Sequence, residues 1–338
     1  MLANLQAVRA LAAIGVVVFH FGLMPATALP FTVGAAGVDL FFVLSGFIIA
    51  HSSARDPRRF LAHRLIRVVP AYWIATLVAA LFTLPAMSLG DAFGWLVQSL
   101  FHLPGPGGRP VLIFVAWTLV YELAFYLLYR LALRFGARRA PLIMLALLPV
   151  LALVRLPGLP GPWPLLLEFG LGIGIYLLAE RHDVLRSVPG AAGLVVAGVG
   201  LTLLLTLPRV TGYDPNDYQS TGRVLTWGLP AGIVILGLVA AERGGLAVRN
   251  KVVLLLGAAS YAIYLLHPIA VGQLFQLPPN RPPLSWLYLV GALAVTLAVS
   301  LVFHLQIEAP LLRWMRSRLG DRPPVGPQAP ARASSGWA

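Results

Sequence analysis

The sequence contains no cysteine among its 338 residues, and charged residues make up only 11% of it. The absence of cysteine excludes a disulfide framework, a thiol nucleophile and a cysteine-based metal site. Hydrophobic residues, in contrast, account for 59% of the chain, and the mean hydropathy is +0.83. Such a composition cannot cover the surface of a soluble protein. The sequence therefore predicts a protein that lies in a lipid bilayer.

Apolar segments long enough to cross a bilayer recur along the whole chain. A bilayer core takes about 20 apolar residues per helix. The apolar runs bounded by proline, glycine or charge lie at 5–24, 32–50, 68–86, 111–129, 140–156, 163–180, 189–207, 224–241, 252–274 and 284–306. The stretch from Asp91 to Leu103 is too short to cross, so it is expected to lie in the interface or to re-enter. The predicted fold is all-α, a polytopic bundle of about ten transmembrane helices.

Basic residues are unevenly divided between the segments that connect these spans. With the N-terminus in the cytoplasm, 19 of the 25 Lys and Arg residues fall on the cytoplasmic side and five on the outer side. Lys and Arg concentrate in the cytoplasmic loops of membrane proteins. This pattern predicts a multi-pass protein of the inner (plasma) membrane with both termini in the cytoplasm. The net charge of +13 is then a topology signal, and no binding of nucleic acid is expected.

Two regions differ in composition. Residues 1–311 hold all the expected spans and form the transmembrane domain. Residues 312–338 are basic and rich in proline, serine and glycine, which predicts a disordered cytoplasmic tail.

Arg9 and His20 are the two ionisable residues of the first expected span. Ionisable side chains are costly within a bilayer, so each one is a candidate for function. The two residues are eleven positions apart, which puts them on one helix face about 16 Å apart along the axis. Taken singly, Arg9 would be an arginine that reaches the headgroups and His20 a histidine hydrogen-bonded within the bundle. Their shared face favours a common cavity.

Two of the carboxylates that fall within expected spans are candidates for the site. Asp39, in GVDLFFVLSGF, lies at an outer depth similar to that of His20, so the two could pair. Such a pair would fix one imidazole tautomer and raise its basicity, whereas the alternative is an aspartate at a span end that faces water. Glu122, in WTLVYE, lies deeper and close to Trp117. It needs a partner such as Arg9, and the alternative reading is a structural buried pair.

Two further motifs carry candidate residues. In RLIRVVPAYW, Arg64 and Arg67 are one turn apart on one helix face at the cytoplasmic surface. Two guanidinium groups so placed suit a phosphate-bearing ligand, although basic inner loops also serve topology alone. In SYAIYLLH, Ser260, Tyr264 and His267 share one face, with His267 at the level of His20.

Six motifs resemble, in their residues and in their order along the chain, those of the acyltransferase 3 family of bacterial membrane O-acyltransferases. The motifs are LQAVRALAAIGVVVFHF, GVDLFFVLSGFIIAH, FLAHRLIRVVPAYW, WTLVYE, EFGLGIGIY and SYAIYLLHP, and they run from residue 5 to 268. The resemblance implies a membrane enzyme that moves an acyl group, most often acetyl from cytoplasmic acetyl-CoA, to a hydroxyl group. The implied acceptor is a carbohydrate, in particular a cell-envelope or exported glycan. Residues 1–311 would then be the acyltransferase domain.

The resemblance and the residue patterns together predict a site without a metal. His20 is expected to act either as a base on the acceptor hydroxyl or as a transient acyl carrier. The expected site residues are His20, Asp39 and Glu122 for catalysis, Arg9, Arg64, Arg67 and Ser45 for binding of acyl-CoA, and Tyr261, Tyr264, His267 and Trp117 for binding of the acceptor. The further partners expected are membrane lipid and, for any second transfer step, a separate extracytoplasmic transferase.

Two alternative functions fit parts of the same pattern. A transporter or flippase for a glycan or a lipid-linked precursor also has about ten spans with buried charge. An acyltransferase could also act on a small-molecule acceptor of the macrolide type. Binding of acetyl-CoA separates the transporter from both enzymes.

Overall fold

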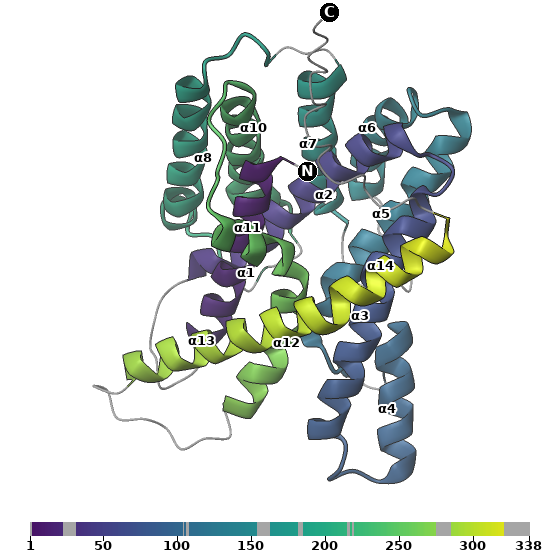
Figure 1. The fold of residues 1–338 in the computed structure, drawn as a ribbon. Coiled ribbons are helices and arrows are strands. Elements are labelled where there is room, and N and C mark those ends of the chain that lie inside the picture. The colour runs from purple at the N-terminus through teal and green to yellow at the C-terminus, as the bar shows by residue number, and fades with distance from the viewer. Residues whose placement is uncertain are drawn as a thin grey trace, which may run out of the picture.

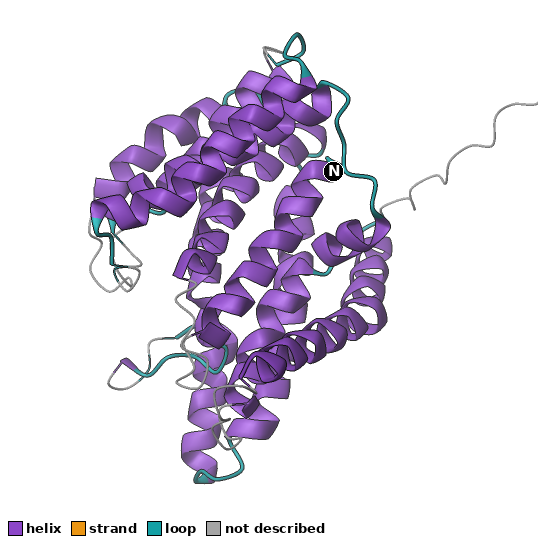
Figure 2. Ribbon diagram, turned by 90° about the vertical axis from the view of Figure 1, so that its left-hand side faces the viewer, coloured by secondary structure: helices purple, strands orange, loops and turns teal. Residues whose placement is uncertain are grey.

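The protein is an all-helical bundle. The computed structural model describes residues 2–22, 32–103, 105, 108–153, 163–181, 185–214, 217, 220–274 and 285–320, and every regular element within these residues is a helix (Figure 2). The main helices, labelled in Figure 1, are α1 (Ala3–Gly22), α2 (Gly37–Arg55), α3 (Phe60–Thr83), α4 (Leu89–Phe101), α5 (Trp117–Ala132), α6 (Ala140–Leu153), α7 (Leu166–Tyr176), α8 (Gly190–Thr211), α9 (Thr221–Arg223), α10 (Leu229–Arg243), α11 (Lys251–Ala258), α12 (Ser260–Leu274), α13 (Ser285–Phe303) and α14 (Ala309–Arg318). The expected all-α class is confirmed.

Seven helices of the described residues are long and apolar enough to cross a membrane. They are Ala3–Gly22, Thr32–Arg55, Phe60–Thr83, Phe114–Phe135, Gly190–Thr211, Thr221–Arg243 and Leu289–Arg318. An eighth is counted if α11 and α12, which are bent by 67° at a short break, form one span. These helices overlap eight of the ten expected spans.

The other two expected spans, 140–156 and 163–180, contain shorter helices. Within the described residues, α6 has 14 residues and α7 has 11, followed by a π-helical turn over Leu177–Arg181. The count of ten spans and the cytoplasmic placement of the termini therefore remain predictions.

Helices α2 and α7 pack closely because glycine lines both sides of their contact. A Cβ atom on Gly46 would lie 2.0 Å from the carbonyl oxygen of Phe169, and one on Gly172 would lie 2.0 Å from that of Val43. The phenyl ring of Phe169 stacks between those of Phe42 and Phe125, with centroid distances of 4.8 and 4.4 Å. This close contact fixes the depth of α2, which carries part of the site described below.

The beginning of α1 is anchored to the end of α10. The Glu242 carboxylate accepts hydrogen bonds of 2.8 Å from the main-chain N–H groups of Ala3 and Asn4. A carboxylate is favourable there because the first N–H groups of a helix have no partner within the helix. This contact fixes the position of α1, which carries Arg9 and His20.

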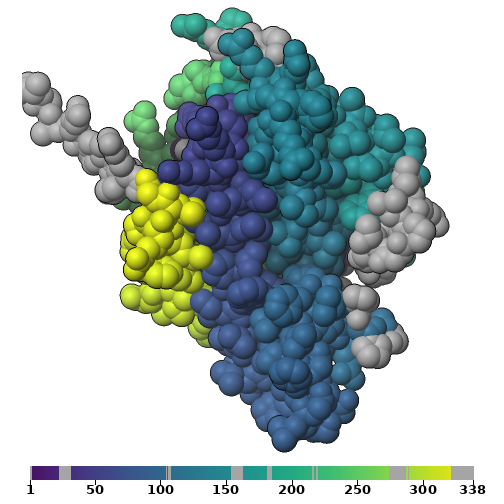
Figure 3. All heavy atoms as spheres, turned by 90° about the vertical axis from the view of Figure 1, so that its right-hand side faces the viewer, coloured from purple at the N-terminus to yellow at the C-terminus, as the bar shows by residue number. Residues whose placement is uncertain are grey.

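Helices α3 and α4 form a hairpin that extends beyond the rest of the bundle (Figures 1 and 3). The Ser88 hydroxyl accepts a hydrogen bond from the main-chain N–H of Asp91 and begins α4. Helix α4 contains most of the short stretch 91–103 and runs back along α3. On another side of α3, α14 packs against it.

Candidate active site

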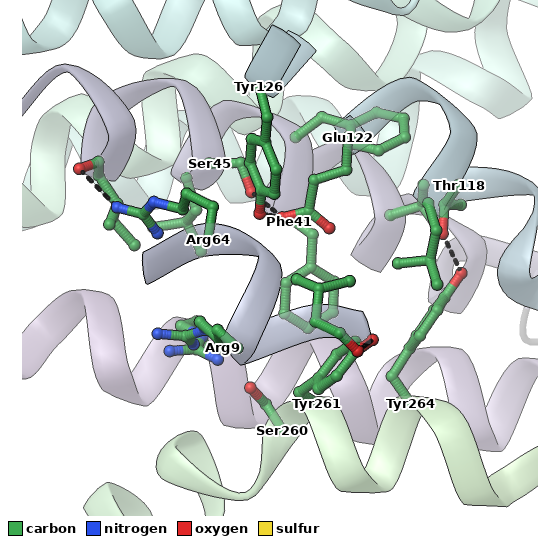
Figure 4. Close-up of a pocket in the computed structure, with 17 residues that line it drawn as sticks. Arg9, Phe41, Ser45, Arg64, Thr118, Glu122, Tyr126, Ser260, Tyr261 and Tyr264 are labelled. Atoms are coloured by element: carbon green, nitrogen blue, oxygen red, sulfur yellow. Dashed lines mark hydrogen bonds between the residues drawn. The ribbon is translucent and has the colours of Figure 1, made fainter. Parts of the chain in front are cut away.

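An open cavity of about 90 Å³ lies between α1, α2, α3, α5 and α12 (Figure 4). It contains most of the residues predicted for the site. Those that line it are Arg9, Ser45, Arg64, Arg67, Glu122, Tyr261 and Tyr264. The predicted residues outside its lining are His20, Asp39, Trp117 and His267.

Three arginines line one part of the cavity. Arg64 is tied to α2, because its guanidinium donates to the Ser52 hydroxyl and to the main-chain oxygen of Ile48. Arg67 makes no hydrogen bond or ion pair with any described residue, so its donors remain available to an anionic ligand. Arg9 is only 7% exposed and lies opposite Arg64 across the cavity (Figure 4). The predicted grouping of these three residues is thus present.

The cavity continues into a wider basic vestibule. Arg64, Arg67 and Ile48 line both spaces. Further basic residues line the vestibule alone, namely His51, Arg55, Arg59, His63, Arg313 and Arg316. Leu2 and Leu5 of α1 also line it, so the vestibule lies at the end of the bundle where α1 begins. A polyanionic group could be held in the vestibule while its extension enters the cavity.

Glu122 is held by two hydroxyl groups rather than by an identified ion pair. The hydroxyls of Ser45 and Tyr126 both donate to its Oε1. Hydrogen bonds to a carboxylate are a common way to satisfy its charge where water is scarce. Tyr126 was not predicted for the site, although its i+4 spacing from Glu122 places it on the same helix face.

Helix α12 presents three polar side chains to the cavity. The hydroxyl of Tyr261 donates to the main-chain oxygen of Val68, and that of Tyr264 donates to the main-chain oxygen of Val115. Ser260 is fully buried, and its hydroxyl has no hydrogen-bond partner among the described residues. It points into the cavity toward Arg9 (Figure 4). An unsatisfied buried hydroxyl at that place fits a ligand with a hydrogen-bonding group.

His20 and His267 form a pair beyond the end of the cavity. Nδ1 of His20 lies 3.2 Å from Nε2 of His267 and 2.9 Å from the main-chain oxygen of Val16. A carbonyl oxygen only accepts, so the bond to Val16 requires a proton on Nδ1 and leaves the lone pair on Nε2 of neutral His20. The Tyr264 ring lines the cavity and also contacts the His267 ring, at a centroid distance of 5.8 Å. The two histidines thus lie at one level of the bundle.

Asp39 does not pair with His20. Both of its oxygens bind the Arg223 guanidinium, with distances of 3.0 Å to Nε and 2.7 Å to Nη2. Arg223 also stacks over Trp227. Arg223 is one of the five basic residues predicted to lie on the outer side, and the sequence did not connect it to Asp39. The signal available was that a fully buried aspartate needs a cationic partner.

Trp117 belongs to the hydrophobic core. Its ring contacts that of Tyr121 at 6.0 Å, and it packs against the cluster of apolar residues between α3, α5 and α7. The expected contact of Trp117 with an acceptor therefore has no support from the cavity lining.

Comparison with known proteins gives one family and several relatives. The family described as an acyltransferase domain matches residues 2–305. The exopolysaccharide production protein ExoZ of Rhizobium meliloti (strain 1021) is 30% identical over 311 residues, which cover 85% of this chain and 92% of ExoZ. The acyltransferase MdmB of Streptomyces mycarofaciens is 28% identical, over 87% of this chain and 84% of MdmB. The peptidoglycan O-acetyltransferase OatA of Listeria monocytogenes is 25% identical, over 55% of this chain and 29% of OatA. No solved structure matches.

Proposed function

The chain belongs to the acyltransferase 3 family and is an O-acyltransferase, and from this premise we propose that it moves an acyl group, acetyl in the simplest case, from cytoplasmic acyl-CoA to a hydroxyl of a carbohydrate. The observation that carries the donor part is the basic vestibule that shares Ile48, Arg64 and Arg67 with the cavity, together with Tyr264, which lines the cavity and contacts His267. A thioester on a long polyanionic carrier has the shape and charge that the vestibule and the cavity accommodate.

The phosphate groups of the donor bind at Arg64 and Arg67. A guanidinium offers paired donors to phosphate oxygens, and those of Arg67 are not used within the described part of the protein. The pantetheine arm then extends through the cavity, where the Ser260 hydroxyl is available to one of its amide groups. Arg9 and His20 are about 16 Å apart along α1, so the arm carries the thioester toward His20.

His20 is the general base in this proposal. Its Nε2 takes the proton of the acceptor hydroxyl as the hydroxyl oxygen attacks the thioester carbonyl carbon. The carbon–sulfur bond then breaks, and the departing sulfur of CoA takes up that proton. The bond from Nδ1 to Val16 places the lone pair on Nε2 of the neutral ring before the proton is transferred.

The acceptor class rests on the relatives. One is named for exopolysaccharide production and another for O-acetylation of peptidoglycan, and both names indicate a glycan. The match to ExoZ extends over 92% of that protein, so a carbohydrate is the acceptor we propose.

Donor binding is tested by replacing Arg67 with Gln in the purified protein. We expect acetyl-CoA binding measured by calorimetry to weaken by at least about 10-fold, since a hydrogen bond to a charged group contributes about 1.5–3 kcal/mol. Arg67 has no hydrogen-bond partner among the described residues, so thermal stability should be unchanged. Arg134→Gln/Arg139→Gln, which changes two exposed arginines outside both cavities, is the control. Unchanged affinity in Arg67→Gln would contradict this assignment.

The role of His20 is tested by His20→Ala. We expect acetyl transfer to glycan to fall by about 10²–10⁴-fold, the usual contribution of a general base, while acetyl-CoA still binds at the arginines. His267→Ala should reduce transfer less, because the Val16 oxygen still binds Nδ1 of His20 when His267 is replaced. Radiolabelled acetyl transfer and calorimetry measure the two effects separately. Equal losses in the two variants would move the base to His267.

A further inference from the structure

Helix α4 uses one polar face to hold the main chain of residues 109–116. Trp95, Gln98, Ser99 and His102 have the spacing i, i+3, i+4 and i+7, which places them on one side of the helix. Each of the four forms a hydrogen bond with that segment. The bonds are Trp95 Nε1 to Pro110 O (2.9 Å), Gln98 Nε2 to Arg109 O (2.8 Å), Leu112 N to Ser99 Oγ (2.9 Å) and His102 Nε2 to Ala116 O (3.1 Å).

These contacts persist at neutral pH and fix the segment at several points. Burial lowers the pKa of His102, so the ring is neutral and donates through one nitrogen. The Arg109 guanidinium also lies over the Trp95 ring, at 5.0 Å from its centroid. A segment whose main chain is bound at four places by side chains of another helix has a defined position.

The held segment presents one aromatic ring beside the histidine pair. Ile113 and Val115 are buried, whereas Phe114 between them is 39% exposed. The ring centroid of His20 lies 5.2 Å from that of Phe114 and 5.0 Å from that of Phe19. Phe114 does not line the donor cavity. Phe114 therefore contacts His20 from outside the lining of the donor cavity.

We propose that residues 109–116, held by α4, form a platform on which the ring of Phe114 seats the pyranose ring of the acceptor next to His20. The inference rests on the proposed function. The face of an aromatic ring is negative, and the C–H groups on one face of a pyranose are weakly positive donors. An apolar ring at this place binds the sugar without competing for the proton of its reacting hydroxyl. Phe114 is the acceptor contact, and the four α4 side chains are positioning residues that act through the main chain.

The platform differs from the lipid-facing apolar surface that any membrane helix has. Phe93 on α4 is 70% exposed, and its side chain makes no ring contact or hydrogen bond with the described residues. Phe114, in contrast, contacts the proposed catalytic base and sits on a segment that four hydrogen bonds hold. The same substitution at the two positions thus separates an acceptor contact from general apolar surface.

The experiment compares Phe114→Leu, Phe114→Tyr and Phe93→Leu in proteoliposomes. The donor is radiolabelled acetyl-CoA, and the acceptor probes are the p-nitrophenyl β-glycosides of glucose, galactose and mannose. We expect Phe114→Leu to raise the KM for a pyranoside by about 3- to 10-fold with the KM for acetyl-CoA unchanged. Phe114→Tyr keeps the ring and should restore the wild-type KM, and Phe93→Leu should behave as wild type. Ser99→Ala, which removes the acceptor for the Leu112 N–H, should also raise the pyranoside KM alone.

Three other results of this experiment would each contradict a stated part of the proposal. Equal behaviour of Phe114→Leu and Phe93→Leu means that the ring faces lipid only, which rejects the platform and leaves the proposed function intact. A parallel loss of acetyl-CoA affinity in Phe114→Leu means a general structural role, which also rejects it. If the wild-type protein binds acetyl-CoA but labels none of the pyranosides, the proposed acceptor class is wrong and the platform is rejected with it.

Discussion

The fully buried carboxylate of Asp39 is neutralised by an arginine that is distant in the sequence. Arg223 is itself only 2% exposed and binds both carboxylate oxygens. Arg223 also donates to the main-chain oxygen of Ala35, at the turn that begins α2. Breaking a buried pair is costly because it leaves an uncompensated charge. The pair therefore joins α2 to the start of the α9–α10 helix and has a structural role.

The pair leads to a prediction that separates stability from catalysis. Asp39→Asn and Arg223→Gln should each lower the free energy of unfolding by about 3–5 kcal/mol. The double variant should lose less than the two singles together, because it removes both charges of the pair at once. Thermal unfolding in detergent measures these losses. At a temperature where Asp39→Asn remains folded, the pH profile of transfer should match that of the wild type, and a shifted profile at full stability would instead link Asp39 to His20.

The sequence predicted how deep the site residues lie in the bundle more accurately than it predicted which side chains they contact. Helical spacing put Arg9 and His20 on one face and His267 at the level of His20, and the structure has a 3.2 Å contact between the two histidines. The same reasoning gave Asp39 a depth within the second span but the wrong partner. Spacing along one helix sets height and face, whereas neighbours across the bundle depend on which helices pack together.

At the scale of the elements, close approach of two helices depends on single glycines. Gly46 of α2 faces the main chain of α7, and Gly172 of α7 faces that of α2. On α7, a methyl group added to Gly174 would have no neighbouring atom within 4 Å, so this glycine makes no such contact. Gly172 and Gly174 thus share one sequence context but differ in what a methyl group would meet.

The α2–α7 contact predicts opposite effects for chemically identical changes. Gly46→Ala and Gly172→Ala would place a methyl group 2.0 Å from a carbonyl oxygen, so the helices must separate. Each should lower stability by about 1–3 kcal/mol, the usual cost of overpacking. Gly174→Ala should be neutral or slightly stabilising, since alanine favours helix by about 1 kcal/mol over glycine. Thermal unfolding in one detergent compares the three, and equal stability of all three would contradict this packing.

One element departs from the expected pattern in a way that matters for the site. The run 252–274 reads as one span, yet the helix breaks near Ala259 and turns by 67°. No proline marks the break. A Cβ atom on Gly257 would lie 2.0 Å from the main-chain oxygen of Gln6, so α11 packs tightly on α1. Hydropathy reports only the apolar length, and the tertiary contact that accompanies the bend is not visible in it.

At the scale of the whole molecule, the two ends of the bundle have different chemistry. The end where α1 begins carries the arginines of the vestibule. The histidine pair and Phe114 lie toward the other end of α1, about 16 Å from Arg9 along the helix axis. In the predicted topology the arginines face the cytoplasm, where acyl-CoA is present. In the proposed function, the acyl group would cross much of the bundle on its carrier, and donor and acceptor would approach from opposite sides.

The orientation can be tested directly because the chain has no cysteine that would give background labelling. We expect single cysteines at Thr83 and Thr211 to react with a membrane-impermeant maleimide in intact cells. Cysteines at Ser187 and Ser317 should react only after lysis, since they lie in segments predicted to be cytoplasmic. All four wild-type side chains are exposed, so a lack of labelling reports the membrane and not burial. If Ser187→Cys and Ser317→Cys were labelled in intact cells, the basic vestibule would face outward, where cytoplasmic acyl-CoA could not reach Arg64 and Arg67, and the donor path would have to be rejected.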